Sequence, residues 1–137
     1  MAGELLGGCI DVFAELIGTS LWPALDEWKN KILLIETSEA DMPEMVLGWF
    51  LRNLHAQGIL SVIKGIVVGK PAVKAKYEPY KDVYRQVVGV EAGLPDLPIL
   101  YNVNVGHAYP IGVLPLGLRY EIDCEKKMFT LMEPATA

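Results

Sequence analysis

The run Lys31–Glu36 constrains the fold more than any other feature, because four apolar residues stand between two charged ones without alternation. A short apolar run without alternation is typical of a strand that is covered on both faces, as in mostly parallel sheets. We therefore expect a central strand here. Two similar runs, Val62–Val68 and Ile99–Val105, predict further strands of the same sheet.

Segments with helical spacing lie between these strands. Each has apolar residues on one face and a glycine at or just after its end. They are Ile10–Ile17, the segment from about 41 to 58, and Glu78–Val88. In the second helix we place Trp49 on the buried face. The runs Leu118–Asp123 and Met128–Met132 predict an antiparallel hairpin. This order of elements indicates an α/β fold with an antiparallel addition.

The composition limits the classes of protein and partner. A chain of 137 residues with 52% hydrophobic content can bury one core, so we expect residues 1–137 to form a single domain. The net charge of -5 opposes binding to nucleic acid, which requires clustered cations. No apolar run approaches the length of a membrane span, and no basic region with a long apolar stretch begins the chain. We therefore expect no membrane contact.

The two cysteines, Cys9 and Cys124, lie far apart in the sequence. Neither has a histidine or a second cysteine nearby at the spacing of metal ligands. The sequence thus predicts neither a disulfide framework nor a metal site. Free thiols fit a reducing compartment, and we expect a cytoplasmic protein.

Two ionisable residues stand where predicted strands end, namely Glu36 and His107. Open α/β sheets place functional groups beyond the carboxyl ends of their strands. A carboxylate that orients a histidine is two thirds of a Ser-His-acid triad, in which the histidine accepts the proton of the serine. From position alone, each residue also has an interpretation without a catalytic role. Glu36 is then a solvated carboxylate, and His107 only hydrogen-bonds its loop.

The nucleophile of such a triad is missing from this chain. Its serines are Ser20, Ser38 and Ser61, and none lies in the Gly-x-Ser-x-Gly turn that exposes a reactive hydroxyl. Ser38 is two residues from Glu36, but a small polar residue that opens a loop is the commoner reason for a serine there. We expect the serine to lie outside this chain.

Five short segments carry a family resemblance by their order and spacing. They are Gly7-Gly8-Cys9-Ile10 with Gly18-Thr19, Lys31–Ser38, Gly65–Gly69, Gly106-His107 and Leu114–Gly117. Together they resemble the carboxyl-terminal domain of the LD-carboxypeptidase family, which includes muramoyltetrapeptide carboxypeptidases and microcin C self-immunity peptidases. The resemblance is slightly closer to the microcin-immunity branch, although Cys9 stands where family members often have Asn.

The resemblance implies a swivelling β/β/α domain with a mostly parallel central sheet and a smaller antiparallel sheet. It also implies that Glu36 and His107 are the acid and base of a Ser-His-Glu triad, with the serine on an amino-terminal domain. The implied reaction is hydrolysis of an amide near a carboxyl terminus, without a metal or organic cofactor. The implied partners are that amino-terminal domain and a peptide or peptidyl-nucleotide substrate, and we also expect a homodimer.

Two other functions remain open for the same residues. His107 on a glycine-flanked loop could be a phosphohistidine of a carrier domain, but a neighbouring Glu36 would repel the phosphoryl group. A non-catalytic ligand-binding domain is the other alternative. The triad hypothesis predicts that both side chains face one surface depression, bordered by apolar surface.

Overall fold

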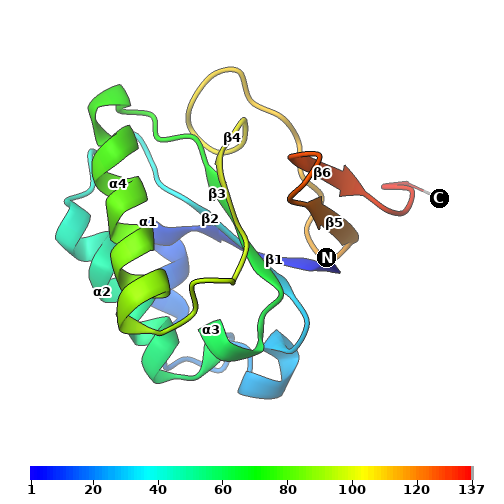
Figure 1. The fold of residues 1–137 in the computed structure, drawn as a ribbon, viewed down its shortest axis with the longest axis horizontal. Coiled ribbons are helices and arrows are strands. Elements are labelled where there is room, and N and C mark those ends of the chain that lie inside the picture. Colours follow the sequence, from blue (N-terminus) through cyan, green and yellow to red (C-terminus); the bar gives the residue numbers. More distant parts are fainter. Residues whose placement is uncertain (137) are drawn as a thin grey trace.

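The computed structural model describes residues 1–136, which form one six-stranded sheet in the order β4-β3-β2-β1-β5-β6 (Figure 1). Strands β1 to β4 are parallel, whereas β5 and β6 are antiparallel to their neighbours. The strands are β1 Ala2–Cys9, β2 Ile32–Glu36, β3 Gly65–Gly69, β4 Ile99–Val103, β5 Arg119–Asp123 and β6 Met128–Leu131. The predicted α/β class is therefore confirmed, and the antiparallel part joins the parallel part through β1.

The helices lie in the connections between the parallel strands. They are α1 Ile10–Phe13 with the 3-10 turn η1 Ala14–Leu16, the 3-10 turn η2 Leu25–Trp28, α2 Glu44–Ala56, α3 Ile59–Val62, the 3-10 turn η3 Lys74–Lys76, and α4 Tyr77–Tyr84 with its π-helical continuation η4 Arg85–Glu91. The three predicted helices are thus present. Among residues 1–136, no helix combines the length and apolar character that crossing a membrane requires.

The sheet is covered on both faces, as the unbroken apolar run predicted. All five residues of β2 are buried. Leu33 and Ile35 pack against the helices, whereas Ile32 and Leu34 belong to a second core under the β5–β6 hairpin and the loop that precedes it. Figure 1 shows the helices on one side of the sheet and the hairpin curled over the other. This two-sided burial confirms β2 as a central strand.

Strand β1 was not predicted from the sequence, because three of its eight residues are glycine, a poor strand former. The structure explains two of them by close backbone approach. A Cβ on Gly3 would lie 2.3 Å from the carbonyl oxygen of Asn30, and one on Gly7 would lie 2.0 Å from that of Leu34. These glycines let β1 lie tightly against its neighbours.

Two strand boundaries differ from the prediction. Val62 was expected to begin a strand, but it lies in α3, and β3 begins at Gly65. Gly58, with a φ of +79°, ends α2 and lets the chain enter a further helical turn, whose apolar residues cannot be told from a strand by their pattern. The strand expected to reach Val105 ends at Val103, after Asn102 adopts a φ of +72°.

The prediction that Trp49 is buried is wrong. Its side chain is 57% exposed, whereas Leu47, Leu51 and Leu54 form the buried face of α2. At 100° per residue, Trp49 is displaced by about 200° from both Leu47 and Leu51, which places it on the far side of the helix. The buried indole is that of Trp28, whose Nε1 donates a hydrogen bond to the carbonyl oxygen of Pro23.

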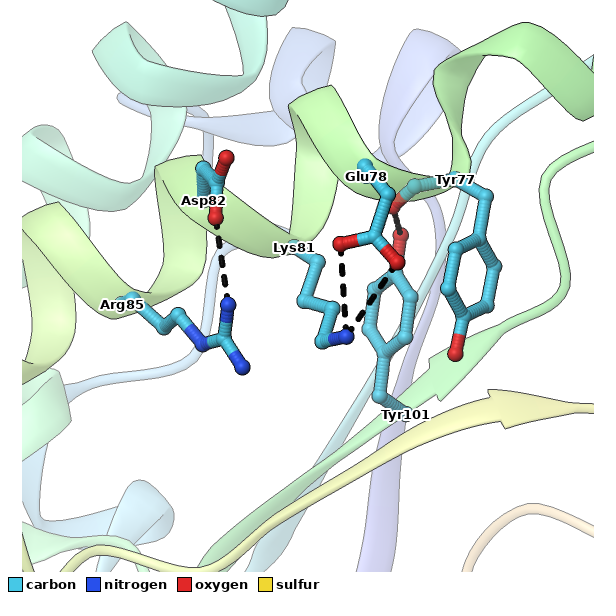
Figure 2. A network of polar contacts seen from close by, with 6 residues as sticks. All are labelled: Tyr77, Glu78, Lys81, Asp82, Arg85 and Tyr101. Carbon is cyan, nitrogen blue, oxygen red and sulfur yellow. Dashed lines mark hydrogen bonds and ion pairs between the residues drawn. The ribbon is translucent and has the colours of Figure 1, made fainter.

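Helix α4 is tied to β4 close to the predicted site. Figure 2 shows that the Tyr101 hydroxyl donates a hydrogen bond of 2.8 Å to the carbonyl oxygen of Tyr77. Burial raises the pKa of Tyr101, so the phenol keeps the proton that it donates. Glu78 and Lys81 form an ion pair beside these rings at 3.3 Å. The first turn of α4 is therefore held against the sheet.

Candidate active site

Because β1 to β4 are parallel, their carboxyl ends lie at the same edge of the sheet. Cys9 at the end of β1 pairs in register with Glu36 at the end of β2. Gly69 at the end of β3 lies on the other side, where an added Cβ would come within 2.6 Å of the Glu36 Cβ. Glu36 is thus enclosed between two strand ends and is only 8% exposed.

Glu36 and His107 contact each other directly, although 71 positions separate them in the sequence. The distance between His107 Nδ1 and Glu36 Oε2 is 2.8 Å. An ionised carboxylate can only accept, so Nδ1 carries the hydrogen and donates it. The ring keeps 41% of its surface exposed, and its second nitrogen, Nε2, is free to accept a proton. The two side chains thus lie together, but the buried Glu36 does not line the cavity beside His107, so the prediction that both face one depression holds for the ring alone.

Gly106 makes this contact sterically feasible. Its φ is +93°, a conformation that side chains disfavour. A Cβ at this position would lie 2.4 Å from Glu36 Oε2. The glycine before His107 is therefore required both by its backbone conformation and by the buried carboxylate beside it.

The surroundings of His107 raise its pKa above the ordinary value. The hydrogen bond that Nδ1 donates to Glu36 is the main cause of the raised pKa. Burial acts in the opposite direction, and the negative charges of Glu36, Glu39 and Asp11 raise the pKa further. Glu39 Oε2 lies 3.7 Å from Nε2. The site thus stabilises the protonated ring, which is the form that a general base reaches during proton transfer.

Cys9 is a site residue that the sequence reasoning missed. Its Sγ, a carboxylate oxygen of Glu36 and a ring nitrogen of His107 all lie within 4.8 Å of one another. The thiol donates a weak hydrogen bond to Asp11 Oδ2 at 3.4 Å, and burial raises the pKa of Cys9 to about 12. The thiol is therefore neutral. The overlooked signal was its position, since Cys9 directly precedes a helix as the last residue of a parallel strand.

A cavity of about 740 Å³ opens beside His107. Residues of several segments line it, among them Lys70, Lys74, Tyr77, Asn102, Ala108 and Tyr109. The Lys70 ammonium donates a hydrogen bond to the carbonyl oxygen of Tyr109, which connects the end of β3 to the loop after His107. The two lysines outnumber the one carboxylate of the lining, Glu78, so the cavity suits a ligand that carries negative charge. Sequence reasoning assigned none of these residues to the site.

An apolar surface follows His107 along the chain, as the triad hypothesis predicted. Tyr109, Ile111, Val113 and Leu116 are all exposed, and Val113 reaches 89%. Ser38, by contrast, has an ordinary loop role, since its Oγ accepts a hydrogen bond from the backbone of Ala40. The surface beside the candidate site is thus apolar on one side and cationic in the cavity.

Comparisons with known proteins show which proteins share the fold of this chain. An MccF-like protein from Streptococcus pneumoniae, solved in complex with AMP, superposes with a TM-score of 0.83 at 30% identity over 96% of this chain and 40% of its own. A Treponema pallidum protein provisionally named a carboxypeptidase is 29% identical over 96% of this chain and 37% of its own length. Muramoyltetrapeptide carboxypeptidase from Oxalobacter formigenes shares the fold, with a TM-score of 0.68 at 22% identity over 88% of this chain and 41% of its own.

The chain therefore spans well under half the length of the relatives that it matches. The family described as the LD-carboxypeptidase C-terminal domain matches residues 2–122, which is most of the chain. Two of the proteins named above are carboxypeptidases by name. This protein belongs to the LD-carboxypeptidase family and corresponds to its C-terminal domain.

Proposed function

We propose that this chain supplies the acid and the base of a serine-type LD-carboxypeptidase, whose serine lies on an amino-terminal domain. The observation that carries the proposal is the 2.8 Å contact between Glu36 and His107 Nδ1. This contact leaves Nε2 as the only ring nitrogen able to accept a proton. A buried carboxylate, an exposed imidazole and an adjacent cavity are the arrangement that a Ser-His-acid triad requires.

The proposed chemistry follows from the roles of the two side chains. His107 Nε2 removes the proton of the serine hydroxyl as the serine attacks the peptide carbonyl, and an acyl-enzyme forms. The protonated ring gives its proton to the departing amine, and Nε2 then activates water for deacylation. Glu36 holds the ring in the correct tautomer and stabilises its charged form, in keeping with the raised pKa of His107.

The proposed substrate is a peptide whose scissile bond lies near a carboxyl terminus, either a murein peptide or a microcin-like peptidyl nucleotide. The cavity beside His107 supports this class, because Lys70 and Lys74 can pair with a carboxylate or a phosphate. The complex of the Streptococcus pneumoniae relative with AMP is consistent with a nucleotide-bearing ligand. The two substrates share the anionic group that this cavity favours.

The apolar surface from Tyr109 to Leu116 supports an amino-terminal partner domain. Its exposed side chains follow His107 directly, so a domain that covers them would also approach Nε2. A phosphohistidine carrier fits the site less well. Nδ1 faces Glu36 and Nε2 lies near Glu39, and both carboxylates would repel a phosphoryl group.

Activity measurements on the two-domain protein test the proposal. We expect His107→Ala to lower kcat about 10⁴-fold or more, and Glu36→Ala somewhat less, because triad residues act as a unit. His55→Ala is the control, since His55 is exposed near the end of α2. The chain alone should not hydrolyse any peptide. Turnover by the isolated chain, or an unchanged kcat in His107→Ala, would overturn the proposal, as would a phosphorylated His107 found by mass measurement.

A further inference from the structure

We propose that Cys9, Glu36 and His107 form a binding site for a thiophilic divalent cation, such as Zn²⁺ or Cd²⁺. A sulfur, a carboxylate oxygen and an imidazole nitrogen from these residues all lie within 4.8 Å of one another. Sulfur and nitrogen ligands with one carboxylate are a donor set that zinc favours. Sequence spacing predicted no metal site, because the three ligands come from separate segments of the chain.

The backbone already places the three ligands around one point. Cys9 and Glu36 are register partners at the ends of β1 and β2, so their side chains lie next to each other on adjacent strands. His107 reaches the same point from the loop after β4 and contacts Glu36 at 2.8 Å. In a tetrahedral zinc site, bond lengths of ~2.0–2.3 Å place neighbouring ligand atoms ~3.3–3.8 Å apart. The ligand atoms lie within 4.8 Å of one another, so side-chain rotations that bring them closer by about 1 Å would close the site around a cation.

Cation binding changes the hydrogens on these groups in a defined way. The Cys9 thiol releases its proton to solvent, because the thiolate is the form that binds metal. The neutral imidazole moves its hydrogen from Nδ1 to Nε2, so that Nδ1 can bind. Glu36 exchanges its hydrogen bond from Nδ1 for a bond to the cation. Asp11, whose Oδ2 lies 3.4 Å from Cys9 Sγ, or a water molecule can complete the coordination.

The bound cation would block His107 as a base. Once Nδ1 binds the metal, Nε2 carries the ring hydrogen and cannot accept the proton of a serine. This consequence rests on the proposed function, whereas cation binding itself does not. The site would therefore make the hydrolase sensitive to inhibition by thiophilic cations.

Titration of the isolated chain with Co²⁺ and Cd²⁺ tests the site, with the thiolate-to-metal absorption band as the readout. We expect one band at a ratio of one cation per chain. Cys9→Ser should abolish the band, and His107→Ala should weaken cation binding by at least about 10-fold. Cys124→Ser is the matched control, because Cys124 is the other free cysteine and is exposed. Circular dichroism of each variant verifies its fold.

Four results would overturn the inference. They are the absence of any band in the unmodified chain, a band that persists in Cys9→Ser, a band that disappears in Cys124→Ser, and affinity that is unchanged in His107→Ala. The two-domain enzyme separates this inference from the proposed function. If the cation binds the chain but does not inhibit the enzyme, the cation site is supported and the role of His107 as the base is contradicted. If no cation binds, only the proposed cation site is contradicted.

Discussion

The contact between Glu36 and His107 links the chemistry of the site to its stability. The folded protein raises the pKa of His107 above its value in the unfolded chain, mainly through the hydrogen bond to Glu36. A raised pKa means that folding favours the protonated ring. This stabilisation is fully present below the ordinary pKa of histidine and is lost as the pH rises through the raised value. The half-exposed ring keeps the contribution modest.

Glu36→Gln should lower the pKa of His107 toward that of an unfolded histidine. The amide removes both the negative charge and the strongest acceptor for Nδ1, which are the causes of the raised value. NMR titration of the ring resonances in the isolated chain measures the change. Glu39→Gln is the control and should have a smaller effect, because Glu39 is exposed and 3.7 Å from Nε2. Equal decreases in the two variants would contradict the assigned cause.

Strand β1 positions the site, although its sequence looks unlike a strand. Its first residues pair with β5, and Leu5–Cys9 pair with β2. The strand thereby joins the antiparallel part of the sheet to the parallel part and places Cys9 beside Glu36. The glycines of β1 allow this double pairing by close backbone approach. Substitutions in β1 should therefore affect both stability and the site.

Gly7→Ala should destabilise the protein by roughly 2–5 kcal/mol, through steric overlap and an unfavourable φ. The added Cβ would lie 2.0 Å from the backbone oxygen of Leu34, at a φ of +142°. Gly8→Ala is the matched control, since Gly8 has a similarly unfavourable φ of +159° but its Cβ would meet nothing within 4 Å, so the difference between the two variants reports the Leu34 contact. Urea denaturation of both variants measures the difference. Similar losses would refute the role of the Leu34 contact.

The described residues bury both faces of the sheet but leave apolar side chains exposed at one place on the surface. Both faces of the sheet are packed, one by helices and the other by the hairpin and its preceding loop. The segment from Tyr109 to Leu116 nevertheless exposes several large apolar side chains beside His107. Several large apolar side chains exposed within one short segment are typical of a surface that a partner covers. We expect isolated chains to associate through it when no amino-terminal domain covers it.

Val113→Asp should shift the isolated chain toward the monomer, because a charge placed in an apolar interface must be desolvated. Val113 is 89% exposed, so its substitution should change the stability of the fold by no more than about 0.5 kcal/mol. Val90→Asp is the control, since Val90 is also exposed but lies in η4. Sedimentation over a range of concentrations measures the association. Equal shifts in both variants would place the interface elsewhere.

Local pattern alone predicts much of this protein. The unbroken run from Ile32 to Ile35 predicts a strand buried on both faces, and the structure confirms it. Helical spacing predicts three helices, although it places Trp49 on the wrong side of α2. Glu36 and His107 stand out because each lies at the end of a predicted strand or just beyond it. These inferences succeed because burial and the ends of strands are reflected in the pattern of a few neighbouring residues.

The remaining features depend on contacts between distant segments. Cys9 lies beside Glu36 only because of the register between β1 and β2, and the pattern of a glycine-rich segment does not reveal that register. Lys70 and Tyr109 share a cavity only because the loop after β4 returns over the end of β3. The contact of His107 with Glu36 spans 71 positions. Such proximity is determined by how the strands pair and where the loops cross, so only the folded chain decides it.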